Sequence, residues 1–195
     1  MKSLFSISFF LFIASCFSQQ VSMINKELEL NDSLVYSREI RVYKFLNLTE
    51  KAEVFQMFDK GYNDWEVYIY SFSKTLNQIT KIDNFKFPKA TNRSLKAKEA
   101  HLIWLNILLC NVDYLPSMDK IDYKLSKKRI ESGELVMERS KILDGCSYEV
   151  FFRNNKIRNH FSFSNAEAYL EQYPDVDELI LYNKLLLVLK NEFSF

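Results

Sequence analysis

Glycine, proline, cysteine and histidine are all scarce in this sequence of 195 residues, which contains three, three, three and two of them. Loops that bind phosphate groups need glycine, because it lets the backbone approach a ligand closely. Zinc sites need histidines and cysteines clustered at short spacings, and no such cluster is present. There is also no Gly-x-Ser-x-Gly motif and no motif around a cysteine. We therefore expect no cofactor and no bound metal, and no motif identifies catalytic residues.

Long hydrophobic runs are absent beyond the N-terminus. The longest later run, residues 102–110, contains Asn106 and falls far below the ~20 residues that span a bilayer as a helix. We therefore expect no transmembrane segment. The chain begins with Met1-Lys2, continues with an apolar stretch over residues 4–14 and then has small and polar residues, which is the pattern of a secretory signal peptide. We predict a signal peptide over residues 1–18 and an exported protein.

The end of the signal peptide has two interpretations. Cleavage after Ser18 would leave a free protein that begins at Gln19. Alternatively, Ile13-Ala14-Ser15-Cys16 resembles the lipobox of bacterial lipoproteins. This resemblance covers four residues, and it implies that Cys16 becomes the lipidated first residue. The protein is then expected to be secreted, periplasmic, or anchored by lipid to the cell envelope.

An excess of charge of one sign is also lacking. Removal of residues 1–18 removes one basic residue, Lys2, and leaves 25 basic residues against 25 acidic ones. Nucleic-acid-binding proteins usually carry a basic excess, and electrostatic attraction to anionic lipids needs one too. We expect neither partner, and instead expect an unknown protein or an extracellular ligand. The abundance of Lys, Asn, Phe, Tyr and Ile is typical of an AT-rich bacterial genome.

The rest of the sequence predicts a polar leader over residues 19–33, either mobile or a short helix, and a single α+β domain over residues 34–195. Runs rich in Val, Ile, Tyr and Phe are typical of strands. The first four runs cover Tyr36 to Leu46, Ala52 to Phe58, Trp65 to Phe72, and Thr80 to Phe87. A helix is predicted from Leu95 to about Val112, and a second from about Val176 to Glu192. We expect mainly antiparallel sheet, about eight strands in two runs, packed against this central helix and this C-terminal helix.

The second run of strands has the clearest turns. A strand is predicted around Ile121, Tyr123 and Leu125. Three further strands are expected at Glu134–Leu143, Cys146–Arg153 and Lys156–Phe163, joined by two-residue turns at Asp144-Gly145 and Asn154-Asn155. Such turns fix the register, so positions that sum to 289 and to 309 should oppose each other.

This register predicts an apolar face and a largely solvated face. The apolar face holds Tyr148, Val150, Phe152, Met137, Ile157 and Phe161, and the other holds Glu149, Phe151, His160, Arg158, Ser140 and Glu138. It places His160 directly opposite Glu149. We interpret this pair either as an acid–base couple or as a surface ion pair between strands.

Two further features concern the starts of helices and the two cysteines of the domain. Ser164 with Glu167, and Asp175 with Glu178, have the spacing of capping boxes at helix N-termini. Cys110 and Cys146 either pair in an oxidising compartment or remain free thiols.

On the strand from Trp65 to Phe72, both faces are apolar, which favours a strand covered on both sides. If one face is open, the stripe formed by Tyr68, Tyr70 and Phe72 would provide a binding surface for a protein or a sugar. The leading hypothesis is therefore an exported, non-enzymatic binding or interaction protein of the bacterial cell envelope or exterior. The alternatives are a small exported hydrolase, with His160 and Glu149 as weak candidates for catalysis, and an inhibitor or immunity protein.

Overall fold

A computed structural model of the chain describes residues 19–46, 49, 51–73, 78–86, 95–138, 142 and 144–195. The predicted signal peptide and its lipidation candidate, Cys16, lie outside these described residues. No helix within the described ranges has both the length and the apolar character needed to cross a membrane.

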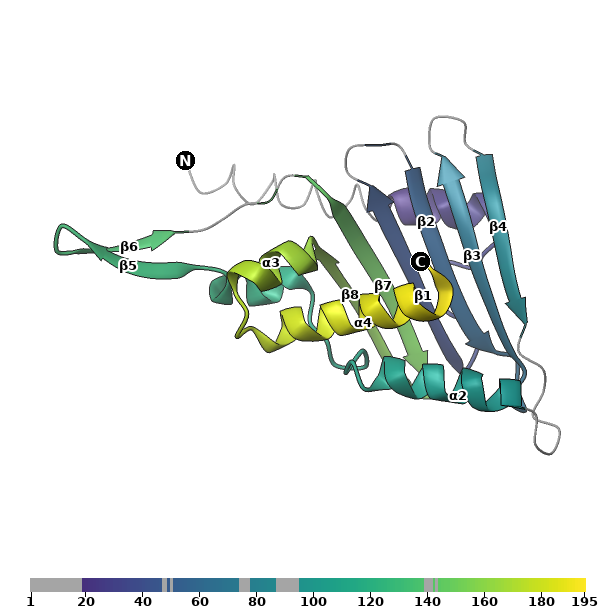
Figure 1. Cartoon of the computed structure of the whole chain (residues 1–195). Coiled ribbons are helices and arrows are strands. Elements are labelled where there is room, and N and C mark those ends of the chain that lie inside the picture. Colours follow the sequence, from purple (N-terminus) through teal and green to yellow (C-terminus); the bar gives the residue numbers. More distant parts are fainter. Residues whose placement is uncertain are drawn as a thin grey trace.

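Six antiparallel strands form one sheet in the order β4-β3-β2-β1-β7-β8 (Figure 1). The strands are β1 (Arg38–Leu46), β2 (Lys51–Asp59), β3 (Trp65–Ser73), β4 (Gln78–Lys86), β7 (Cys146–Asn154) and β8 (Ile157–Ser164). The first four follow one another as a meander, close to the predicted runs. The hairpin of β7 and β8 then pairs with the free edge of β1. The predicted α+β class with mainly antiparallel strands is therefore confirmed, and β1 lies inside the sheet although it comes first in the sequence.

A separate two-stranded hairpin, β5 (Lys127–Glu131) and β6 (Glu134–Glu138), projects away from the body of the molecule (Figure 1). Its turn is at Ser132-Gly133, where both residues have positive φ.

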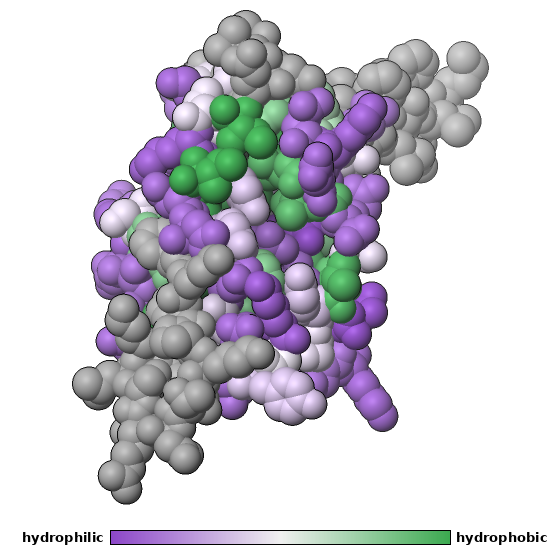
Figure 2. All heavy atoms as spheres, turned by 90° about the vertical axis from the view of Figure 1, so that its right-hand side faces the viewer, coloured by the Kyte–Doolittle hydropathy of each residue, from purple (hydrophilic) through white to green (hydrophobic). Residues whose placement is uncertain are grey.

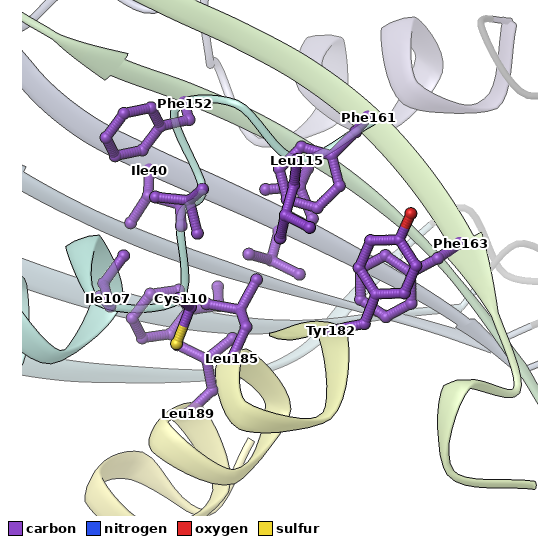
Figure 3. Packing of buried hydrophobic residues seen from close by; sticks show 14 of the residues in the cluster. Ile40, Ile107, Cys110, Leu115, Phe152, Phe161, Phe163, Tyr182, Leu185 and Leu189 are labelled. Carbon is purple, nitrogen blue, oxygen red and sulfur yellow. The ribbon is translucent and has the colours of Figure 1, made fainter. Parts of the chain in front are cut away.

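One face of the six-stranded sheet, the helical face, packs against the central and C-terminal helices (Figure 1). These are α2 (Leu95–Leu108) and α4 (Asp177–Phe193), and the short helices η1 (Met118–Lys124) and α3 (Ala166–Gln172) lie between them in the chain. Alternate strand residues such as Ile40, Phe152 and Phe161 point towards the helices (Figure 3). The ring of Tyr182 lies parallel to that of Phe163, with centroids 4.6 Å apart. Burial of large side chains here stabilises the fold by roughly 1.5–3 kcal/mol for each side chain.

The opposite face, called the second face below, is covered in part by a helix over residues 19–27 (Figure 1). Its buried side chains form a second hydrophobic cluster with the sheet, made of Val21, Ile24, Leu28, Tyr43, Ala52, Val54, Tyr70 and Phe72. Much of the predicted polar leader is therefore a packed helix. Three apolar residues at spacings of three and four provide its buried side, although polar neighbours obscure this short pattern in the sequence.

Strand β4 forms one outer edge of the sheet. Figure 2 faces this side of the molecule and shows a hydrophobic area in its upper part, with hydrophilic side chains to its left and right. Ile79 and Ile82 of β4 are both exposed. Lys81 and Asp83, between and beside them, form an ion pair at 2.6 Å. Charged side chains of this kind discourage edge-to-edge pairing with other chains.

Two predictions for the second run of strands are wrong. Ile121 and Tyr123 lie in the 3-10 helix η1, and Leu125 follows its last residue. Ile121 and Leu125 are buried while Tyr123 is exposed, so the three side chains do not share one face as they would in a strand. The predicted pairing with β7 does not form for residues 134–138 either, and Ser140 of the same predicted strand lies outside the described residues. Both neighbours of β7 are other strands, β1 and β8, and β6 pairs with β5. Met137, which we expected on the apolar face, is therefore exposed on the projecting hairpin.

Gly145 has a different role from the one that we predicted, which was to form a two-residue hairpin turn with Asp144. Its φ is +120°, and a Cβ atom at this position would collide with the side chain of Asn165. Asn165 Oδ1 accepts a hydrogen bond from the amide of Cys146 at 3.0 Å, and the Asn165 amide donates to the Cys146 carbonyl at 3.0 Å. Glycine is needed here because Asn165 binds the backbone of the next residue.

The β7–β8 hairpin forms as predicted, but its turn is one residue later. Asn154 pairs with Ile157, so the turn residues are Asn155 and Lys156 and opposed positions sum to 311. A shift of two in this sum keeps every side chain on its predicted face, because side chains alternate with a period of two. The predicted direct opposition of His160 and Glu149 is wrong, since Phe151 lies opposite His160.

The predicted capping boxes do not form. Asn165 and Val176 occupy the N-cap positions of α3 and α4, and neither makes a side-chain capping bond. The carboxylate of Glu178 instead accepts a hydrogen bond from Lys124. Cys110 and Cys146 are free thiols.

Candidate functional site

Three polar residues are buried together on the second face, where strand side chains would otherwise be apolar. Glu39 and Arg41 point to this face from β1, and Gln56 comes from β2, where it lies opposite Arg41. Arg41 Nη2 donates to Glu39 Oε1 at 2.9 Å, and Gln56 Nε2 donates to the same oxygen at 2.9 Å. A buried ion pair is tolerated only when hydrogen bonds satisfy its remaining atoms. The remaining hydrogen-bond partners of Glu39 and Arg41 therefore identify the segment that this network holds in place.

Those partners belong mainly to the leader loop, defined here as residues 29–36. Glu39 Oε2 accepts hydrogen bonds from the amides of Val35 at 2.9 Å and Tyr36 at 3.0 Å. Arg41 Nη1 donates to the Asn31 carbonyl at 2.7 Å. Buried charges at the centre of the sheet thus fix the loop that connects the N-terminal helix to β1.

A tyrosine and an asparagine complete the network. The hydroxyl of Tyr43 bonds to Asn25 Oδ1 from the N-terminal helix, and Arg41 Nη1 lies 3.3 Å from the same hydroxyl. Burial raises the pKa of Tyr43. Burial opposes the charge on Arg41, but Tyr43 and Glu39 outweigh it and raise the pKa of the guanidinium. Arg41 is therefore a permanent cation inside the fold.

An aromatic row borders this network. Tyr36 stacks on Phe58 with centroids 4.2 Å apart, Phe58 on Tyr68 at 5.9 Å, and Tyr68 on Tyr70 at 5.8 Å. The four rings come from the leader loop, β2 and β3. Burial raises the pKa of Tyr70 to about 12, so its hydroxyl remains protonated at physiological pH.

The aromatic row and the charged network line one cavity of about 430 Å³, called the polar–aromatic pocket below. Its other lining residues are Glu29, Leu30, Asn31, Val35, Lys60 and Glu66. At its rim, Lys60 Nζ lies 2.7 Å from Glu66 Oε1, and the Tyr68 hydroxyl donates to Glu66 Oε2 at 2.9 Å. Arg41 Nε is buried and has no hydrogen-bond partner. The pocket thus combines aromatic surface with paired charges.

The titratable side chains of the described pocket lining are glutamates, tyrosines, Lys60 and Arg41, and no histidine, cysteine or serine is among them. Both oxygens of Glu39 already accept hydrogen bonds, so this carboxylate is held as a structural anion. The described part of the chain also contains no group of three His, Cys, Asp or Glu side chains placed to hold a metal ion.

His160 and Glu149 meet on the same face, but in a different place. His160 Nε2 contacts the Glu149 carboxylate diagonally across β7 and β8, and the His160 ring stacks on Phe151 with centroids 4.3 Å apart. The side chains are 54% and 15% exposed. His160 and Glu149 do not line the polar–aromatic pocket. The predicted pair is therefore formed, as a partly exposed contact away from that pocket.

Sequence patterns pointed to two of the four aromatic rings of the pocket, Tyr68 and Tyr70, and missed both the other two rings and the charged part. The stripe of Tyr68, Tyr70 and Phe72 was expected to be either covered or an open surface. Tyr70 and Phe72 are buried, whereas Tyr68 is partly exposed and lines the pocket. Glu39 and Arg41 alternate with apolar residues on β1, which is the pattern of a solvated face. Glu39 and Arg41 are buried because the leader loop covers them. The sequence feature that could have indicated this burial is the presence of two opposite charges at alternate positions of a strand.

Comparison with protein-family models, with curated proteins and with solved structures gives no match. Function is therefore inferred from the geometry of the second face alone.

Proposed function

We propose that the protein is an exported, non-enzymatic binding protein of the cell envelope or exterior, and that the polar–aromatic pocket is its ligand site. The observation that carries this proposal is one cavity lined both by the aromatic row and by the polar side chains of Glu39, Arg41 and Gln56. The expected ligand is a small polar molecule that hydrogen-bonds to the polar part of this lining and has an apolar part that contacts the aromatic row.

Residues at the rim offer the best test, because replacement of Arg41 would disturb the fold itself. Monosaccharides, amino acids and dipeptides are screened as ligands by the rise in melting temperature, since binding to the folded state stabilises it. For a ligand that raises the melting temperature, we expect Tyr68→Ala to weaken binding at least tenfold. Tyr123→Ala, which removes an exposed ring on η1, is the matched control and should bind normally.

Backbone amide shifts then locate the bound ligand. We expect the largest changes at Gln56 and Tyr68, which line the pocket. A ligand that shifts residues elsewhere, or that binds both variants equally well, would contradict the assignment of this pocket.

A further inference from the structure

We propose a second site on the same face, between Arg153 of β7 and Arg158 of β8, that binds a small oxyanion such as phosphate or a carboxylate. The two arginines are directly opposed in the register of the hairpin. Side chains so placed lie on the same face with Cβ atoms about 5 Å apart, and like charges in this position destabilise a sheet. An anion bound between them would convert this repulsion into attraction.

Neither guanidinium is neutralised by a carboxylate in the described part of the chain. Arg153 donates only to backbone carbonyls, from Nη1 to Leu34 at 3.1 Å and Val35 at 3.0 Å and from Nε to Asn155 at 3.3 Å. These bonds orient the Arg153 guanidinium but leave its charge in place. Arg158 is exposed, and no ion pair within the described residues involves it.

The two arginines line a cavity of about 390 Å³. Ser33 and His160 also line it, and His160 is joined to Glu149 outside the cavity. Asp32 contributes the single carboxylate of the lining, and its Oδ1 accepts a hydrogen bond from Asn25 at 2.9 Å. The permanent charges of the lining are therefore two guanidinium groups against one carboxylate.

Guanidinium groups suit this role because their planar N–H groups match the oxygens of carboxylate and phosphate. The site is separate from the polar–aromatic pocket. Residues 32–34 of the leader loop line the arginine cavity, whereas residues 29–31 and 35–36 line the pocket. The charge of Arg41 in the pocket is balanced by Glu39, whereas no carboxylate among the described residues balances the charge of Arg158. The oxyanion site thus goes beyond the proposed function, and each can fail without the other.

Titration with inorganic phosphate at constant ionic strength, maintained with NaCl, tests the proposal. The arginine Nε–H resonances are followed by NMR. We expect saturable shifts of Arg153 and Arg158 in the unmodified protein, and binding at least tenfold weaker in Arg158→Gln. Lys156→Gln is the matched control, because it removes the same charge at the hairpin turn from a residue that does not line the cavity. It should bind phosphate normally.

Melting temperature provides a second readout that does not depend on assigned resonances. In the absence of phosphate, Arg158→Gln should melt at the same temperature as the unmodified protein or higher, because it removes a repulsion. It should also lose the rise that phosphate produces. A titration with acetate distinguishes the two kinds of oxyanion: a saturable response to either supports the site. No saturable response to either anion, an equal response to added NaCl, or equal weakening by Lys156→Gln would overturn the proposal.

Discussion

Glu39 and Arg41, separated by one residue on β1, form an ion pair at 2.9 Å in which the side chains are 0% and 3% exposed. Arg129 and Glu131 have the same separation on β5 and a pair distance of 3.3 Å, but both side chains are more than half exposed. The two pairs have similar local geometry and differ in burial. They therefore allow the effect of burial on an ion pair to be measured within one molecule.

We predict that Arg41→Met lowers the free energy of unfolding by about 3–5 kcal/mol, because it leaves a buried carboxylate without its cation. Arg129→Met should cost less than about 1 kcal/mol, as expected for an exposed pair. Urea unfolding measures both. The double variant Glu39→Gln/Arg41→Met should be destabilised by less than the sum of its two single variants. Additive losses would show that the two side chains are not coupled.

The sequence was sufficient to predict the elements that local patterns define. Runs rich in Val, Ile, Tyr and Phe located β1 to β4, and the Asn-rich turn located the β7–β8 hairpin to within one residue. Pairing between β1 and β7 joins segments about 110 residues apart, and no local turn specifies it. The same limit applies to the candidate site. Glu39 and Arg41 look solvated in the sequence and become buried only because the leader loop packs over them.

The N-terminal helix provides the second prediction. Ile24 is 1% exposed and packs against the second face of the sheet. Ile24→Ala should therefore cost about 2–5 kcal/mol, the usual loss for a large apolar side chain in a core. Lys26→Ala, on the exposed side of the same helix, should change stability by less than about 0.5 kcal/mol. Equal and small effects of both variants in urea unfolding would mean that this segment is a mobile leader.

The two thiols should differ in reactivity. Cys110 is buried, and burial raises its pKa to about 11, so roughly one molecule in a thousand carries the reactive thiolate at pH 8. Cys146 is only partly buried. Iodoacetamide should therefore add one group to the folded mature protein, at Cys146, and a second at Cys110 after unfolding. Intact mass measures the number of groups. Failure of the unfolded, unreduced protein to react at either position would show a disulfide instead.

The ion pair of Lys124 on η1 and Glu178 on α4 predicts a pH dependence. Lys124 Nζ lies 2.6 Å from Glu178 Oε1, and the side chains are 33% and 18% exposed. Burial would raise the pKa of Glu178, but the bond from Lys124 prevails and lowers it below its ordinary value near 4.5. A lowered pKa in the folded state stabilises the protein above the unfolded-state value, and this contribution is lost as the pH falls through the folded-state value.

We therefore expect Glu178→Gln to remove up to about 1 kcal/mol of stability at pH 6 and progressively less towards pH 3. Urea unfolding across this range gives the comparison. Glu192→Gln, which replaces an exposed carboxylate on the same helix, is the control and should parallel the unmodified protein. A constant difference between Glu178→Gln and the unmodified protein at every pH would exclude this ion pair as its cause.

The mature N-terminus determines how the second face is presented. Intact mass of the protein from its native host should correspond either to a chain that begins at Gln19 or to one that begins at a lipid-modified Cys16. In the second case, only Phe17 and Ser18 would lie between the lipidated residue and Gln19, where the described helix begins, and these three steps along the chain span at most about 11 Å. Because Val21 and Ile24 pack that helix on the sheet, the second face and both of its cavities would then lie close to the membrane surface. A mature chain that retains residues 1–18 would contradict export by signal cleavage.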